Sequence, residues 1–129
     1  MKPIIVSETY PYKLDLAWEI ISDLKRTDWV PGVENITLNG DVRSFTMEGM
    51  GKIKEKILLC DERKKILQYS AIQTSIPIKH HLSTIELAEI KEGFLLKWTV
   101  EIEPSSYIPA IEQSVLMSLK ELHKVLKAI

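Results

Sequence analysis

Two residues of opposite charge, Arg43 and Glu55, fall in stretches whose alternation predicts apolar strand faces. Glu55 stands between Ile53 and Ile57, and a carboxylate on such a face costs several kcal/mol unless it is paired. A hairpin loop over residues 48–50 would set Arg43 opposite Glu55 on the neighbouring strand, whereas a two-residue loop would break that parity. The pair could bind a polar group of a ligand, move a proton, or be only a structural ion pair at a cavity mouth.

Histidine at position 81 is the other candidate acid–base group. His80 and His81 are adjacent on an expected strand, so their side chains point to opposite faces and cannot bind one metal ion together. The inward His81 could be a general base, a donor to a ligand, or a hydrogen-bonded wall residue. Ser83 lies parallel to His81 on the same strand, which excludes a nucleophile–base pair. We therefore expect no metal and no cofactor, and the candidate catalytic residues are Arg43, Glu55 and His81.

Aromatic residues with polar tips supply the expected walls of a ligand site. Trp29, Tyr69, Trp98 and Tyr107 could line a cavity that suits an amphipathic ligand, although Trp98 fits a packed core equally well. Together with residues from the expected inward faces, they make up the predicted ligand-binding set: Trp29, Arg43, Phe45, Glu55, Tyr69, His81, Ser83, Trp98, Tyr107, Ile111 and Val115.

The elements that would position these residues follow from hydrophobic periodicity. Apolar residues within 14–24 recur at spacings of three and four, which predicts a short helix, and residues 25–30 are expected to add a helical turn that ends at Pro31. Asn39-Gly40 is expected to close a hairpin, since this pair tolerates positive φ. Runs rich in β-branched and aromatic residues predict seven antiparallel strands, at 3–10, 33–38, 42–48, 51–60, 65–75, 79–89 and 93–103.

One face of this sheet is expected to be dry. In the strand at 51–60 the lysines share one face and the other face is apolar apart from one carboxylate: Lys52, Lys54 and Lys56 oppose Ile53, Glu55, Ile57 and Leu59. Aliphatic residues at spacings of three and four predict a long helix over residues 105–129, which would cover the dry face. A strongly twisted sheet wrapped around one helix leaves space that a single aliphatic row does not fill, so we expect a cavity.

Length and composition limit the classes of protein that this chain can be. Its 129 residues, 45% of them hydrophobic, have the size of one domain, here residues 1–129. With 17 basic and 18 acidic residues the formal charge is −1, so no net field favours binding to nucleic acid. No apolar run approaches the roughly 20 residues of a membrane span and no secretory signal is evident, so we expect a cytoplasmic protein. Cys60, the only cysteine, permits no intrachain disulfide and is expected to be buried. The sequence leaves open whether the protein forms a homodimer.

Residues spread over nearly the whole chain add a further indication: Trp18, Asp23, Trp29-Val30-Pro31-Gly32, Val42-Arg43, Gly51, Glu55, Asp61, Arg63, Tyr69, Pro77, Gly93, Trp98 and Pro104. In their order and spacing the chain resembles the polyketide cyclase/dehydrase branch of the START-like, Bet v 1-like superfamily, also called SRPBCC proteins. The resemblance implies an α+β helix-grip fold, in which a curved seven-stranded antiparallel sheet surrounds a long C-terminal helix, with two short helices after the first strand. It also implies that an apolar small molecule binds between sheet and helix.

Three functions of different classes are open on this basis. The first is a carrier or sensor that binds a small hydrophobic or aromatic molecule, such as a lipid, a polyketide or a quinone-like compound. The second is a cyclase or dehydratase in which Glu55 or His81 abstracts a proton while Arg43 or Tyr69 stabilises the oxyanion. The third is a ligand-free interaction domain with a filled interior. A large apolar cavity would favour the carrier, and a cavity where Arg43, Glu55 and His81 converge would favour the enzyme.

Overall fold

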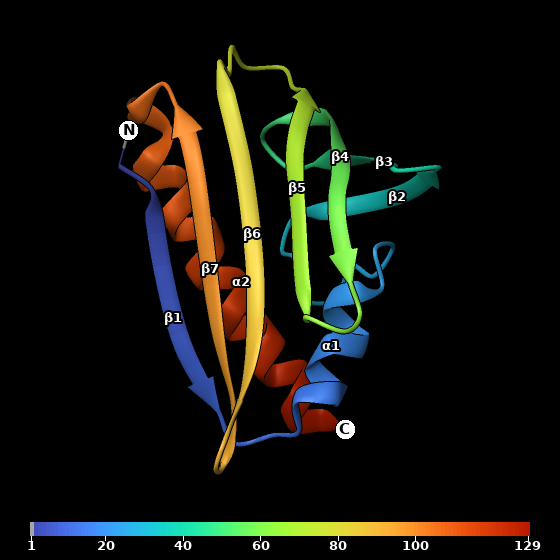
Figure 1. Cartoon of the computed structure of the whole chain (residues 1–129). Helices are drawn as coiled ribbons and strands as arrows, with labels where there is room; N and C mark the ends of the chain where they lie inside the picture. The colour runs from blue at the N-terminus through green and yellow to red at the C-terminus, as the bar shows by residue number, and fades with distance from the viewer. Residues whose placement is uncertain (1) are drawn as a thin grey trace.

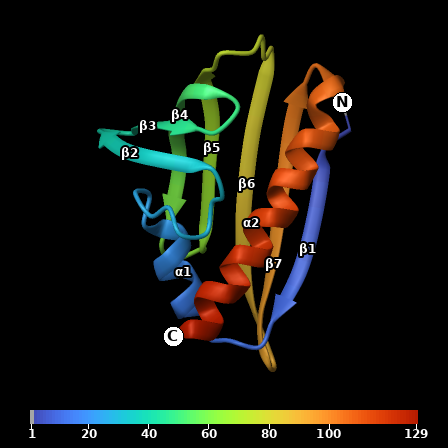
Figure 2. The same ribbon diagram turned by 180° about the vertical axis from the view of Figure 1, so that it is seen from behind.

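A seven-stranded antiparallel sheet and one long helix make up most of the protein. The computed structural model describes residues 2–129 and shows the helix lying across one face of the sheet (Figures 1 and 2). The strands run in the order β1-β7-β6-β5-β4-β3-β2, which leaves the first two strands of the chain at opposite edges. The expected α+β helix-grip architecture is confirmed. The strands are β1 (Ile4–Tyr10), β2 (Val33–Asn39), β3 (Val42–Met47), β4 (Gly51–Asp61), β5 (Ile66–Gln73), β6 (His80–Ile90) and β7 (Gly93–Glu103). The helices are α1 (Leu14–Ser22), the single turn η1 (Ser105–Tyr107) and α2 (Ile108–Ala128).

The face of α2 that meets the sheet is aliphatic. Val115, Leu119, Leu122 and Leu126 recur every three or four residues and are at most 3% exposed. One core joins them to alternate residues of β7: Phe94, Leu96, Trp98, Val100 and Ile102. Helix α2 is therefore the cover of the dry sheet face, as expected (Figure 2). No helix within residues 2–129 is long and apolar enough to cross a membrane.

Only one helix, α1, lies between β1 and β2, so the expectation of two short helices after the first strand is wrong. The backbone amides of Arg26, Val30 and Val33 each bond to the carbonyl three residues earlier, which makes separate turns instead of a continuous helix. A helix cannot run on, because Pro31 disfavours the helical conformation at Val30. The turns still carry Trp29 into the core, where it is 5% exposed.

The hairpin between β2 and β3 turns one residue later than expected. Asn39 pairs with Val42, so Gly40 and Asp41 form the loop. Gly40 has a φ of 63°, a conformation that suits a residue without a Cβ atom. The two strands still form the expected antiparallel hairpin, with a shifted register.

A β-bulge in β4 changes which residues face the core. The register passes from Ile57 opposite Tyr69 to Leu59 opposite Gln68, so Leu58 is an extra residue in β4. The alternation shifts by one position beyond the bulge. Leu59, which the uninterrupted alternation had placed on the dry face, is exposed as a result. Cys60, which was expected to be buried at the end of an apolar run, is exposed as well.

Candidate functional site: a cavity between the sheet and α2

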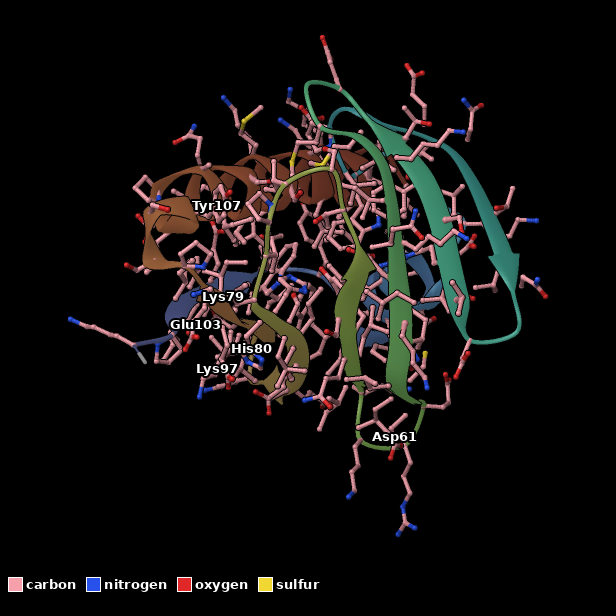
Figure 3. The ribbon with its side chains drawn as sticks, turned by 90° about the horizontal axis from the view of Figure 1, so that it is seen from above. Asp61, Lys79, His80, Lys97, Glu103 and Tyr107 are labelled. Atoms are coloured by element: carbon pink, nitrogen blue, oxygen red, sulfur yellow. The ribbon has the colours of Figure 1, made fainter. Side chains whose placement is uncertain are left out.

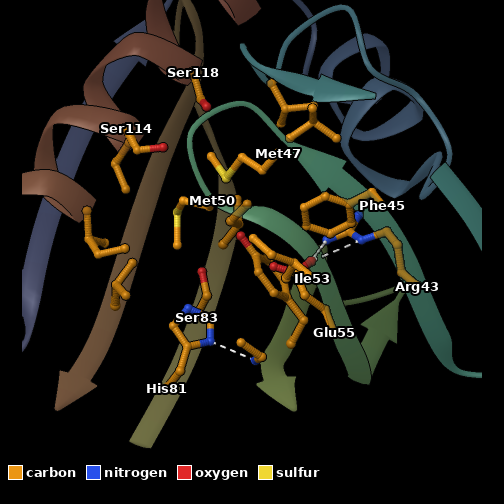
Figure 4. Close-up of a pocket in the computed structure, with 18 of the residues that line it drawn as sticks. Arg43, Phe45, Met47, Met50, Ile53, Glu55, His81, Ser83, Ser114 and Ser118 are labelled. Atoms are coloured by element: carbon orange, nitrogen blue, oxygen red, sulfur yellow. Dashed lines mark hydrogen bonds and ion pairs between the residues drawn. The ribbon is translucent and has the colours of Figure 1, made fainter. Parts of the chain in front are cut away.

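A cavity of about 410 Å³ lies between the inner face of the sheet and α2. Its wall comes from β2 to β7, from the turns after α1 and from the N-terminal half of α2, and most of its side chains are aliphatic or aromatic (Figure 4). Every residue of the predicted ligand-binding set lies on this wall: Trp29, Arg43, Phe45, Glu55, Tyr69, His81, Ser83, Trp98, Tyr107, Ile111 and Val115. Their role in binding stays a prediction.

Arg43 and Glu55 form an ion pair on the cavity wall (Figure 4). The three-residue loop Glu48–Met50 sets the strand register, in which Arg43 lies opposite Glu55. Glu55 Oε1 accepts hydrogen bonds from Arg43 Nη2 at 2.7 Å and from Arg43 Nε at 3.1 Å. Arg43 Nη1 donates to the carbonyl of Leu24 at 3.4 Å. The side chains are 14% and 12% exposed, so the predicted pairing is confirmed and the pair is largely buried.

The second carboxylate oxygen of Glu55 is open to the cavity. Both hydrogen bonds from Arg43 fall on Oε1, and no donor within residues 2–129 reaches Oε2. Among these residues no fully buried side-chain oxygen or nitrogen lacks a partner, so Oε2 keeps accessible surface on the cavity wall. Burial raises the pKa of the Glu55 carboxyl, against the attraction and hydrogen bonds of Arg43. Glu55 therefore offers a hydrogen-bond acceptor when ionised and can exchange a proton with a bound molecule.

Tyr69 lies between the ion pair and His81. The guanidinium carbon of Arg43 stands 5.1 Å from the centre of the Tyr69 ring, and the imidazole of His81 is centred 6.1 Å from the same ring. Burial and the Glu55 charge raise the pKa of Tyr69 to about 12, although Arg43 and the Ser83 hydroxyl lower it. Tyr69 is therefore a neutral phenol near pH 7.

A gap in the pairing of β5 and β6 determines which ring nitrogen of neutral His81 carries the proton. The paired register of these strands ends at Tyr69 opposite Ser83. Beyond that point, the backbone N–H of Ala71 donates to His81 Nδ1 at 2.9 Å, and the Ser70 hydroxyl donates to the His81 carbonyl. A nitrogen that accepts a hydrogen bond carries no proton, so neutral His81 bears its proton on Nε2.

His80 points to the opposite face of the sheet. Its Nε2 lies 2.9 Å from Glu101 Oε1, among the outward side chains seen in Figure 3. The two histidines are therefore separated by the sheet, as the strand alternation predicted. No group of three or more His, Cys, Asp or Glu side chains within residues 2–129 is placed to hold a metal ion.

The pKa of His81 predicts how stability depends on pH. Burial, with a smaller contribution from His80, lowers the pKa of His81 to about 4. The unfolded chain takes up this proton near pH 6.5, so between about pH 6.5 and 4 protons favour the unfolded state and stability falls as pH falls. We expect a loss of about 2–3 kcal/mol from this residue over that window.

The check is urea unfolding of the wild type, His81→Phe and His80→Phe at several pH values. Glu55 acts in the opposite sense, because its raised pKa favours the folded state at low pH. Both the wild type and His81→Phe contain Glu55, so the difference between their pH dependences is the contribution of His81. His81→Phe should flatten the pH dependence, and His80→Phe should keep most of it. Equal slopes in the wild type and His81→Phe would contradict the assignment.

Ser83 and Trp98 form a buried polar contact on the wall. Trp98 Nε1 donates to Ser83 Oγ at 2.8 Å, and the rings of Trp98 and Trp29 are centred 5.9 Å apart. Ser83 is 1% exposed. Its hydroxyl satisfies the indole N–H, which fits a structural wall residue and not a nucleophile.

Several wall residues were absent from the predicted set. Ser114 and Ser118 lie on the cavity side of α2, three or four residues from Ile111 and Val115, so helical periodicity could have found them. Met50 and Ile76 come from two loops that the Ser75 hydroxyl links by donating to the Met50 carbonyl. A contact between loops 25 residues apart leaves no periodic signal in the sequence.

The arrangement of sheet, helix and cavity agrees with comparisons to known proteins. A sequence model of the family described as "Polyketide cyclase / dehydrase and lipid transport" matches residues 5–123. The chain belongs to this family. The resemblance to SRPBCC, Bet v 1-like proteins is thereby confirmed. A comparison with curated proteins finds no match.

Solved structures share the fold over nearly the whole chain. XoxI from Bacillus cereus superposes with a TM-score of 0.88 at 22% identity, covering 98% of this chain and 96% of that one. Ara h 8.0201 gives a TM-score of 0.81 at 14% identity and 99% coverage of both chains. Norcoclaurine synthase from Thalictrum flavum gives 0.75 at 19% identity, covering 96% of this chain and 85% of that one. At these identities the likeness shows the family fold alone.

Proposed function

We propose that this protein binds a small amphipathic molecule, apolar over most of its surface, between the sheet and α2, and acts as its carrier or sensor. The observation that carries the proposal is the cavity of about 410 Å³, whose wall is apolar except for a few grouped polar side chains. Ligand sites typically measure about 300–1,000 Å³ and combine an apolar wall with a few polar groups. A cavity of this size disfavours the third hypothesis, an interaction domain with a filled interior.

The comparisons support a ligand of this kind. The family description includes lipid transport. One structure of norcoclaurine synthase from Thalictrum flavum holds dopamine and hydroxybenzaldehyde, two small aromatic molecules with polar groups. The cavity wall of the present chain offers Trp29, Phe45 and Tyr69 as aromatic surfaces for a molecule of similar character.

A second candidate is a cyclase or dehydratase, favoured by the open oxygen of Glu55 and the raised pKa of its carboxyl. A base of this kind could remove the proton next to a ketone and expel a β-hydroxyl as water. The test is dehydration of a neutral aryl β-hydroxyketone, followed as absorbance of the conjugated enone. Turnover that Glu55→Gln abolishes would support the enzyme, and binding without turnover would support the carrier.

Narrowing the cavity from α2 should weaken binding. Ser114 lies on the wall, and Ser114→Phe fills part of the space without removing a partner of Trp98. We expect probe affinity to fall about tenfold or more, equivalent to about 1.4 kcal/mol. Gln113→Phe is the matched control, because Gln113 is exposed and lies off the wall. The measurement is calorimetric titration with neutral naphthyl probes.

The same titrations test the proposal itself. Burial of apolar surface in the cavity should give a negative heat-capacity change. Unchanged affinity in Ser114→Phe would place the binding site elsewhere. Absence of binding across a broad set of apolar probes would favour the interaction domain.

A further inference from the structure

The cavity wall offers no free positive charge. Its charged residues are Asp23, Arg26, Arg43 and Glu55, and no lysine within residues 2–129 lies on it. Glu55 binds Arg43 through two hydrogen bonds. Asp28 binds Arg26 through both of its carboxylate oxygens, at 2.7 and 2.9 Å. An anionic ligand group would therefore find both arginines of the wall already paired with a carboxylate.

His81 adds a donor without adding a charge. Its Nδ1 is occupied by the N–H of Ala71, so the proton sits on Nε2. No acceptor within residues 2–129 bonds to Nε2, and no fully buried side-chain nitrogen there lacks a partner, so Nε2 faces open space. His81 lies on the cavity wall (Figure 4), and burial holds its pKa near 4, which keeps the ring neutral near pH 7.

Glu55 and His81 flank Ala71 from opposite sides. Ala71 lies opposite Glu55 in the register with β4, and its N–H reaches His81 on β6. Both side chains therefore lie against the same residue of β5, Glu55 from β4 and His81 from β6. A donor and an acceptor on one ring-sized body could therefore meet Glu55 Oε2 and His81 Nε2 together, over the small side chain of Ala71.

We propose that the polar part of the ligand is uncharged, accepts a hydrogen bond from His81 Nε2 and donates one to Glu55 Oε2, as a hydroxyaryl ketone would, and that carboxylates are rejected. This inference rests on the proposed binding function and names its ligand class. A carboxylate meets the unpaired oxygen of Glu55 and no compensating cation, so repulsion and desolvation both oppose it.

The test uses four probes with one naphthalene body: naphthalene, naphthyl methyl ketone, the hydroxynaphthyl methyl ketone and naphthoate. Affinities are measured by titration calorimetry near pH 7 with wild-type protein. We expect the hydroxyketone to bind at least about tenfold more tightly than naphthalene, the ketone to lie between them, and naphthoate to bind more weakly than naphthalene. Naphthoate binding as tightly as the ketone would overturn the inference. Equal binding of all four would also overturn it but leave the binding function standing, whereas no binding by any probe would overturn both.

Two variants assign the effects to residues. His81→Phe should reduce the affinity for the ketone to that for naphthalene, while His80→Phe, on the outer face, should not. Glu55→Gln removes the charge that compensates Arg43, so naphthoate affinity should rise about tenfold in this variant. A ketone preference that survives in His81→Phe, or naphthoate affinity that does not rise in folded Glu55→Gln, would count against the inference. The wild-type panel decides the matter if either variant fails to fold.

Discussion

Replacing Arg43 alone by Met, or Glu55 alone by Leu, is expected to destabilise the protein by about 3–5 kcal/mol, because the surviving charge is left largely buried without a partner. The double variant should cost much less than the sum of the two, since an apolar pair of similar volume needs no counter-charge. The 14% and 12% exposure of the two side chains limits how far water can take over the role of the lost partner. The measurement is the free energy of unfolding in urea for all four proteins of the cycle.

The cost of Arg43→Met should also depend on pH. Burial already raises the pKa of Glu55 while Arg43 is present, and loss of the guanidinium raises it further. The variant should therefore be most destabilised at high pH, where Glu55 must stay ionised, and should recover as pH falls through the folded pKa. A cost that does not change with pH would show that the lost packing of Arg43, and not the charge of Glu55, causes the destabilisation.

A surface pair supplies the control. Arg26 and Asp28 also form an ion pair with two hydrogen bonds, one to each carboxylate oxygen, but their side chains are 33% and 49% exposed. Arg26→Met should cost less than about 1 kcal/mol, because exposed ion pairs contribute little. Additive single and double variants at Arg43 and Glu55 would contradict the coupling that the structure shows.

The position of this ion pair could be predicted because loop length and strand period leave few choices. Glu48-Gly49-Met50 turns the chain in three residues, and from there a period of two determines that Arg43 meets Glu55. The long helix was predictable for a similar reason, since its aliphatic spacing persists over the whole of α2. Both features depend only on local patterns and on one turn.

Features that depend on tertiary packing could not be predicted in this way. The bulge at Leu58 has no turn residue to mark it, and this single extra residue moves Leu59 from the expected dry face to an exposed position. The gap between β5 and β6 arises where side-chain and backbone groups of Ser70 and Ala71 bond to His81 instead of continuing the ladder. Strand alternation was enough to place His81 on the cavity wall. The position of the proton on its ring follows only from the hydrogen bond with the Ala71 N–H.

The two halves of α2 contact different parts of the protein, and substitutions in each half should have different effects. Residues from Ala110 to Ser118 contribute to the cavity wall, whereas Leu119, Leu122 and Leu126 lie in the core and off that wall. Leu119→Ala and Leu122→Ala should each cost about 2–5 kcal/mol, because these side chains are 1% and 0% exposed and their loss leaves a void. Leu116→Ala and Met117→Ala, on the outer face at 46% exposure each, should change stability by no more than about 0.5 kcal/mol.

Deletion of residues 105–129 should have the largest effect, loss of cooperative unfolding altogether, because alternate residues of β7 would lose the helix that covers them. A truncated protein that still melts sharply would mean that the sheet is covered by something other than α2. Ligand affinity gives the second readout. Leu122→Ala should lower the melting temperature while the folded protein keeps its probe affinity. Ser114→Phe should weaken probe affinity while the melting temperature changes little. If Leu122→Ala instead weakened binding as much as Ser114→Phe at a temperature where both are folded, the core and the cavity would be one coupled unit, and the division of α2 into a supporting half and a binding half would be wrong.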